Sequence, residues 1–432
     1  MKTNVIWLRR DLRIEDNTAL QSAMREGLPV LPLFIFDTTI LNALLRDDAR
    51  VTFIYSTLLS MHLKLKQKKS GLLIKVGNPE KIWSELLLEY DIDSVFINRD
   101  YEPYALHRDE LIRKLLIKNG VNLQSFKDQV IFEPNEILKN DGNPYTVFTP
   151  YKKRWLDVFS ISPFGETAKD ENTNAAFYEH QIDFPSITQV GFIESPIKPP
   201  EINLSNIFKY DQYRDIPELS ATTLVGPHLR FGTISIRNLI QMASSENLTY
   251  LSELIWREFF MQILYHFPKV VDCNFKSAYD QISWRNNQEE FFCWCTGNTG
   301  YPMVDAGMRQ LNETGYLHNR VRMVAAGFLC KHLLIDWRWG EAYFATHLLD
   351  YELSSNNGNW QWAAGTGCDA VPYFRVFNPL IQAEKFDPKQ NYASRWIPEL
   401  NSSTYAKPIV DHAFARQRAI DTYRQGLIKP HF

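Results

Sequence analysis

The first 130 or so residues alternate short apolar runs with amphipathic segments, and this alternation constrains the fold more than any other feature. Five apolar runs are typical of buried β-strands: NVIWL, VLPLFIF, GLLIKVG, DSVFIN and NLQSF. Apolar side chains recur at helical spacing in residues 17–25, 48–66, 79–90 and 104–118. Strands and helices in alternation predict a doubly wound, Rossmann-like parallel sheet over residues 1–131. No G-x-G-x-x-G follows the first run, so the sequence does not support a tight dinucleotide site there.

The rest of the chain has a different pattern. Residues 132–200 carry much of the proline and predict a long connection laid over the surface. After residue 200 the periodicity is helical almost throughout, with the clearest helices expected at 248–266, 291–295, 301–314, 318–334 and 340–349. We therefore expect an α/β domain, a linker, and an all-helical domain over residues 201–432.

Composition excludes several classes of protein. A chain of 432 residues with 45% hydrophobic and 22% charged residues is typical of a folded globular protein with two domains. The net charge of −3 gives no sign of bulk polyanion binding, although a local basic patch can still hold DNA. No stretch approaches the roughly 18 apolar residues of a membrane span. The five cysteines show no C-x-x-C spacing, which argues against a disulfide framework or a zinc site and favours the reducing cytoplasm.

The stretch SSNNGNWQWAAG, residues 354–365, places two indoles one residue apart. The run of Asn and Gly before them predicts a turn of the chain. If Gly358 and Asn359 lead into a helix, Trp360 and Trp362 are about 200° apart around its axis and face opposite sides.

Three further segments contain residues that could carry chemistry. Hydroxyls before Gly226 and Pro227 could hold a phosphate at a helix start, although an ordinary N-cap is the simpler interpretation. Glu253 and Trp256 share a helix face, which suits recognition of an extruded base but also an ordinary core helix.

In HNRVRM, Arg320 and Arg322 point to nearly opposite sides of the predicted helix. One of them could serve a phosphate or base while the other is buried. A buried arginine needs a carboxylate partner, and Asp350 is the expected one.

Taken together, several long motifs resemble the photolyase/cryptochrome family over essentially the whole chain. They are WLRRDLRIEDNTAL, HNRVRM, LLIDW, NNGNWQWAAGTGCDAVPYFRVFNP and EKFDP. Within the family the chain looks most like a bacterial class I cyclobutane pyrimidine dimer (CPD) photolyase. The resemblance implies an antenna domain, a helical FAD-binding domain, and a carbon–carbon lyase that repairs UV-damaged DNA with light. It also implies a cytoplasmic monomer that needs no metal and does not act at a membrane.

The resemblance assigns the FAD contacts to specific positions. They are Tyr210, Thr222, Thr223, Leu224, Val225, Gly226, Tyr250, Arg257, Arg322, Asp350, Glu352 and Asn356. Arg322 and Asp350 would form an ion pair beside the isoalloxazine, and the amide of Asn356 would face flavin N5. The chain departs from the family in lacking a hydroxyl at Gly226, so that phosphate binding must rely on backbone N–H groups. Glu352 replaces a common Asp and Tyr250 a common Trp.

The resemblance also assigns the substrate and electron-transfer residues. The lesion pocket carries over to Glu253, Trp256, Asn319, Arg320, Met323 and Trp362. A flipped dimer would stack on Trp256 and Trp362, and Glu253 would hydrogen-bond the base edge while light-excited reduced FAD donates an electron. The family's photoreduction chain of three tryptophans matches Trp360, Trp337 and Trp284.

Other activities within and outside the family fit the residues less well. A (6-4) photolyase needs a histidine pair where this chain has His318 followed by Asn319. DASH-type members usually have Tyr at the position of Trp362, and plant cryptochromes have Asp at that of Asn356. A light-sensing cryptochrome without repair activity is the main alternative, and a flavoprotein oxidoreductase would leave the two indoles without a task.

The antenna chromophore is left open by the sequence. Folate-binding members use a glutamate where this chain has Glu102, but the surrounding residues do not choose between methenyltetrahydrofolate and an 8-hydroxy-deazaflavin, or show that either binds.

Overall fold

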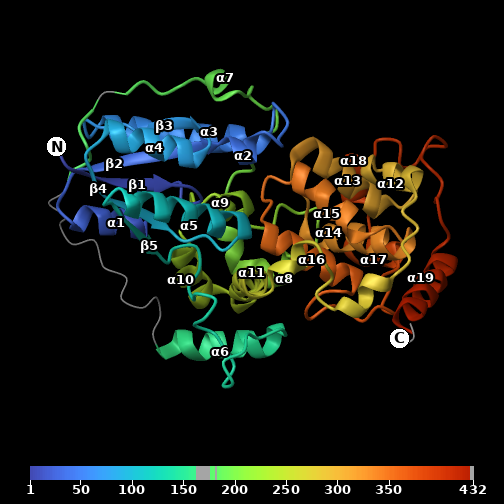
Figure 1. Ribbon diagram of the computed structural model, residues 1–432. Helices are drawn as coiled ribbons and strands as arrows, with labels where there is room; N and C mark the ends of the chain where they lie inside the picture. The colour runs from blue at the N-terminus through green and yellow to red at the C-terminus, as the bar shows by residue number, and fades with distance from the viewer. Residues whose placement is uncertain (162–175, 181, 429–432) are drawn as a thin grey trace. The chain divides into compact units, whose positions relative to one another are not determined.

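The computed structural model describes residues 1–161, 176–180 and 182–428 (Figure 1). The chain forms two compact units. The sheet unit consists of Met1–Ile137, Lys153–Pro199 and Val225–Met242. The helical unit consists of Leu138–Lys152, Pro200–Leu224 and Ala243–Phe432. Each unit therefore collects segments that are separated in the sequence.

The sheet unit is built on five parallel strands in the order β3-β2-β1-β4-β5. The strands are β1 (Thr3–Leu8), β2 (Val30–Asp37), β3 (Leu73–Gly77), β4 (Ile92–Asn98) and β5 (Asn122–Phe126). The order reverses direction beside β1, which is the signature of a doubly wound sheet. The predicted fold of the first domain is confirmed, and each predicted strand lies within two residues of its observed bounds.

Helices cover both faces of the sheet (Figure 1). Ile6 and Phe34 pack with α1 and α3 on one face, whereas Val5 and Leu33 pack with α4 and α5 on the other. Successive strand residues point to opposite faces, so strands buried on both sides are apolar throughout. The helices of this unit are α1 (Thr18–Arg25), α2 (Thr38–Leu41), α3 (Ala49–Lys66), α4 (Pro79–Glu89), α5 (Pro103–Lys118), α7 (Ile187–Val190), α9 (Gly226–Arg230) and the first part of α10 (Ile236–Glu246).

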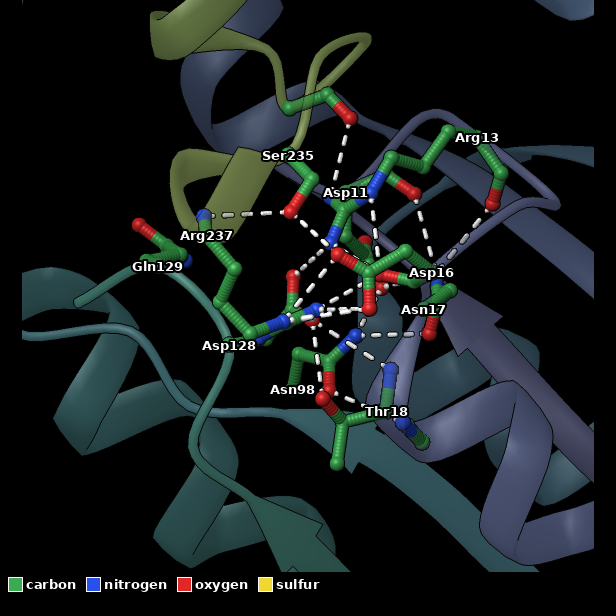
Figure 2. A network of polar contacts seen from close by, with 12 residues as sticks. Asp11, Arg13, Asp16, Asn17, Thr18, Asn98, Asp128, Gln129, Ser235 and Arg237 are labelled. Atoms are coloured by element: carbon green, nitrogen blue, oxygen red, sulfur yellow. Dashed lines mark hydrogen bonds and ion pairs between the residues drawn. The ribbon is translucent and has the colours of Figure 1, made fainter. Parts of the chain in front are cut away.

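A buried polar network ties the late segment 225–242 to the sheet (Figure 2). The carboxylate of Asp128 accepts from Arg13 at 2.7 Å and from Arg237 at 2.8 Å, and its side chain is 1% exposed. Asp16 accepts further bonds from Arg237 and from the hydroxyl of Ser235. Burial alone would raise the pKa of Asp128, but the two guanidinium groups outweigh it and lower the pKa. The network holds two arginines in the interior only because this carboxylate is charged.

We expect Asp128→Ala to destabilise the sheet unit by about 3–5 kcal/mol, because the buried guanidinium of Arg13 would lose its carboxylate partner and that of Arg237 would keep only Asp16. Chemical denaturation followed by circular dichroism would measure this loss. Asp93→Ala removes the exposed partner of Lys2 and should leave the unfolding midpoint within error. Equal effects of the two substitutions would contradict a central role for the network.

The helical unit contains most of the remaining elements. They are η1 (Leu204–Lys209), α8 (Tyr210–Tyr213), α11 (Leu248–His266), η2 (Pro268–Val271), η3 (Ser277–Gln281), α12 (Gln288–Cys295), α13 (Pro302–Thr314), α14 (Asn319–Gly327), η4 (Phe328–His332), α15 (Trp337–His347), α16 (Leu353–Ala364), α17 (Pro379–Phe386), α18 (Asn391–Trp396) and α19 (His412–Leu427). Helix α6 (Phe148–Ile161) begins in this unit, inside the stretch expected to be a connection. Within the described part of the chain, no helix is both long and apolar enough to cross a membrane.

The turn predicted from the Asn and Gly run before Trp360 is wrong. This run lies inside α16, which begins at Leu353. Gly358 is needed for packing, because a Cβ at this position would lie 2.1 Å from Cδ1 of Phe260 on α11. Asn359 bonds the backbone oxygen of Ser355 one turn earlier at 2.8 Å. The residues that look like turn formers thus serve a close helix contact.

Candidate active site

Two adjoining cavities lie in the helical unit and share lining residues from α14 and α16. The first is lined by Asn319, Arg322, Met323, Ala326, Phe344, Leu348, Asp350, Tyr351, Glu352, Ser355, Asn356, Asn359, Trp360, Trp362 and Ala363. The second, of about 350 Å³, is lined by Arg214, Glu253, Trp256, Arg257, Phe260, Asn319, Met323, Ser355, Asn359 and Trp362. A volume of this size suits a small organic group.

Two ion pairs fix charged side chains around the two cavities. Arg322 Nη2 lies 2.8 Å from Asp350, which confirms the partner expected from the sequence. Arg257 Nη2 lies 3.0 Å from Glu352, and these side chains are only 12% and 5% exposed. Buried ions are stable when paired, so both arginines are held in one geometry. The first cavity therefore presents Arg322 together with the carboxylates of Asp350 and Glu352, whereas Arg257 lines the second cavity.

Helix α14 owes its start to His318. Burial lowers the pKa of His318 to about 4, so its imidazole is neutral at physiological pH. Nδ1 can then accept from the backbone N–H of Arg320 at 3.2 Å and cap the helix. This cap sets where Asn319 and Met323, which line both cavities, emerge from α14.

Asn356 lines the first cavity from the second turn of α16. Its Nδ2 donates to the backbone oxygen of Glu341 at 3.1 Å, and the next residue, Asn357, donates to the Glu341 carboxylate at 3.3 Å. The amide of Asn356 is therefore oriented by α15. Burial raises the pKa of Glu341 to about 7, so its carboxyl group takes up a proton close to neutral pH.

Glu341→Gln should stabilise the protein by about 1–3 kcal/mol at pH 8 and change little at pH 5. The folded pKa lies above the unfolded one, so the folded state loses stability as pH rises through the window from 4.5 to about 7. A neutral glutamine escapes this loss. Thermal unfolding of both proteins at the two pH values would test it, and a pH-independent difference would contradict it.

The predicted phosphate loop is held by hydroxyl contacts in the helical unit. The hydroxyl of Thr223 lies 3.0 Å from that of Tyr250, whose ring contacts Tyr210 at 5.0 Å. Burial raises the pKa of Tyr250 to about 12, which keeps its phenol protonated. Leu224 follows with φ +57°, a left-handed conformation that non-glycine residues rarely adopt.

The last two residues of the loop, Val225 and Gly226, belong to the sheet unit. Gly226 begins α9, followed by Pro227, as the sequence indicates. Val225 accepts a helical bond from the backbone N–H of Leu229 at 2.8 Å. A phosphate contact of this pair stays a prediction.

The second cavity brings together most of the residues predicted to bind substrate. Glu253 and Trp256 come from α11, and Trp362 from α16. The carboxylate of Glu253 pairs with Arg214, a residue outside α11, at 2.6 Å. Arg320 pairs with Asp215 at 2.7 Å. It also lies 4.2 Å above the ring of Phe386, which draws this guanidinium toward α17.

The two indoles of α16 differ in burial, and both line the first cavity. Trp360 is 2% exposed and packs against Trp294 and Phe344. Trp362 is half-buried and lines both cavities.

The other two predicted electron-transfer tryptophans differ in solvent exposure. Trp337 is fully buried and donates to Asn274 at 2.9 Å, whereas Trp284 is half-buried against Tyr423. Trp284 is thus the most exposed of the three tryptophans. Their role in electron transfer stays a prediction.

Glu102, the candidate antenna contact, is already paired within the sheet unit. Its carboxylate lies 3.1 Å from Arg10 and 2.6 Å from Arg230. Arg10 also pairs with the buried Asp100 at 3.1 Å. An antenna that used Glu102 would have to join or replace these ion pairs.

Comparison with known proteins identifies the family. The profile described as DNA photolyase matches residues 4–171, and the profile described as FAD binding domain of DNA photolyase matches residues 250–404. A protein of Agrobacterium fabrum named deoxyribodipyrimidine photo-lyase is 34% identical over 467 aligned residues, which cover 97% of each chain. This chain belongs to the DNA photolyase family.

Solved photolyase structures share the fold. The archaeal photolyase of Sulfolobus tokodaii, described with two FAD molecules, is 34% identical, with a TM-score of 0.86 over 98% of this chain and all of the other. A class III photolyase of Agrobacterium tumefaciens is 32% identical, with a TM-score of 0.85 over 98% of this chain and 97% of the other. The two-domain fold and FAD as cofactor, both expected from the sequence, are confirmed.

The residues of the helical unit fit FAD. The first cavity joins a fixed Arg322–Asp350 pair to an oriented amide at Asn356, which together suit a polar ring system with anionic character. The hydroxyls of Thr222 and Thr223 offer partners for phosphate oxygens.

Several residues around the cavities and the hydroxyl loop were not predicted from the sequence. Tyr316 is half-buried, and its hydroxyl lies 3.2 Å from that of Thr222; its place two residues before His318 could have drawn attention to it. Arg214 and Glu341 gave no such signal, because their partners Glu253 and Asn356 lie far away in the sequence.

Proposed function

We propose that this chain is a deoxyribodipyrimidine photo-lyase that repairs cyclobutane pyrimidine dimers in DNA. The observation that carries the proposal is the second cavity, where one carboxylate and two indoles line a space next to the cavity whose lining residues would hold the flavin. The two joined pyrimidines of a dimer offer ring faces that can stack on indoles and edges that can hydrogen-bond to a carboxylate. The names of the relatives support the same activity.

Reduced FAD, when bound, supplies light-driven transfer of one electron to the dimer, with return of the electron after the cyclobutane ring opens. The residues proposed to hold it are those on the walls of the first cavity and on the hydroxyl loop. Arg322, paired with Asp350, would offer hydrogen-bond donors in a fixed position. Arg257 would hold Glu352 in place on the cavity wall, and Asn356 would direct its amide at the ring system.

The chain's own residues would bind and orient the lesion. Extruding a base from the duplex costs a few kcal/mol, least for a damaged pair, and stacking of about 1–3 kcal/mol per base on Trp256 and Trp362 can offset this cost. Glu253 would accept a hydrogen bond from a base edge. Arg214, 2.6 Å from Glu253, keeps that carboxylate in one position. No net oxidation occurs, so geometry and electrostatics suffice.

We further propose that the protein acts as a monomer in the cytoplasm, where the five unpaired cysteines of the described chain would stay reduced. We also propose that the chain is most like class I members, although one similar structure is named a class III photolyase. An antenna chromophore in the sheet unit, of either candidate identity, is a further proposal.

Protein loaded with reduced FAD should restore thymine-dimer oligonucleotides under blue or near-UV light and not in the dark. Restoration is measured by the loss of dimers from the oligonucleotide. Undamaged DNA and flavin-free protein serve as controls. Absence of light-dependent restoration would overturn the proposal and favour a cryptochrome without repair activity.

The two indoles of α16 should separate by function. Trp362→Ala should weaken lesion binding by about 5- to 150-fold, the equivalent of one lost stacking contact, while FAD content is unchanged. Trp360→Phe should slow photoreduction of oxidised flavin, because the buried indole is the first electron donor proposed, and spare repair by pre-reduced protein. Gel-shift titration and flavin absorbance measure the two effects. Loss of flavin from both variants would show that the faces are assigned wrongly.

A further inference from the structure

The indole of Trp256 is stacked on a phenyl ring from a distant segment. The rings of Phe148 and Trp256 have centroids 3.6 Å apart and planes only 10° from parallel. Phe260 stacks on the indole at 5.4 Å, and Phe259 meets it edge-on at 5.6 Å. Trp256 lines the second cavity, whereas Phe148 is buried. One indole face is thus fixed by protein.

Phe148 is itself held at the start of α6. Its backbone N–H donates to the carboxylate of Asp369 at 3.1 Å, and a carboxylate at a helix N-terminus is favourable. One turn later, the ring of Tyr151 packs on Phe259 of α11 at 5.2 Å. Before the helix, the backbone oxygen of Tyr145 accepts from Gln262 at 2.9 Å. The segment 145–151 is therefore attached to α11 on both sides of Phe148.

We propose that Phe148 is a positioning residue for lesion binding, which holds the Trp256 indole in the plane that a flipped base stacks on. The inference rests on the proposed function, because it needs Trp256 as a stacking surface. A free indole would lose rotational freedom when the lesion binds. The stack with Phe148 already restricts the indole in the folded protein. Lesion binding therefore involves a smaller loss of side-chain entropy.

The test measures affinity for a thymine-dimer oligonucleotide in the dark, and for an undamaged one of the same sequence. Phe148→Leu removes the ring but keeps apolar volume. We expect lesion affinity to fall about 3- to 10-fold, the size of one immobilised side chain. Affinity for undamaged DNA, FAD content and the repair yield of the bound dimer should be unchanged. Phe148→Tyr, which keeps the aromatic ring, should restore affinity.

A matched control comes from the sheet unit. Phe132 is a buried phenylalanine whose ring packs edge-on against Trp155 at 5.2 Å. Phe132→Leu removes a similar aromatic contact and should leave lesion affinity unchanged. If Phe148→Leu lowers the FAD content, the affinity measurement is repeated with Phe148→Met. The unbranched methionine side chain fills irregular space and keeps the packing without an aromatic ring.

A double-mutant cycle with Trp256→Leu decides whether Phe148 acts through the indole. In the Trp256→Leu background, Phe148→Leu should cause no further loss of affinity. Equal losses in both backgrounds, or no loss in the wild-type background, would overturn the inference while leaving the proposed function intact. Wild-type protein that fails to distinguish damaged from undamaged DNA would overturn both.

Discussion

Close contact among three helices, made possible by two glycines, is the constraint on which the candidate site depends. A Cβ on Gly358 of α16 would collide with Phe260 of α11, and a Cβ on Gly340 of α15 would lie 2.1 Å from Cη2 of Trp360. Helix α16 is therefore packed between α11 and α15 with no space for a methyl group at either contact. This packing brings side chains of α11 and α16 to one cavity and places the Asn356 amide against the backbone of α15.

Charge pairs then fix what the helix contacts bring together. The Arg257–Glu352 pair joins α11 to the start of α16. The Arg322–Asp350 pair joins α14 to the segment just before α16. Removing one partner of such a pair leaves a buried charge, so the geometry tolerates little change. In the sheet unit, Asp128 does the same for the late segment 225–242 through Arg237. Both units use buried carboxylates to hold segments that are distant in the sequence.

The aromatic residues of the helical unit divide by depth. Trp360 and Trp337 are buried, which suits transfer of electrons through the interior. Trp256 and Trp362 line the second cavity, which Trp360 does not line, and this suits stacking with a base. The helical offset of two residues is enough to send Trp360 and Trp362 to these different surroundings. A stacking surface also needs support, and Phe148 provides it for Trp256.

The sequence by itself determined the five strands and the longer helices of residues 1–131, and Asp350 as the partner of a nearby arginine. These follow from periodicity, which reports the local path of the chain and which faces are buried. Tertiary structure alone decided that Gly358 lies within a helix, because only the position of Phe260 shows why the Cβ is missing. It also decided the partners Arg214 for Glu253 and Phe148 for Trp256, since contacts between distant segments depend on how helices pack and not on spacing along the chain.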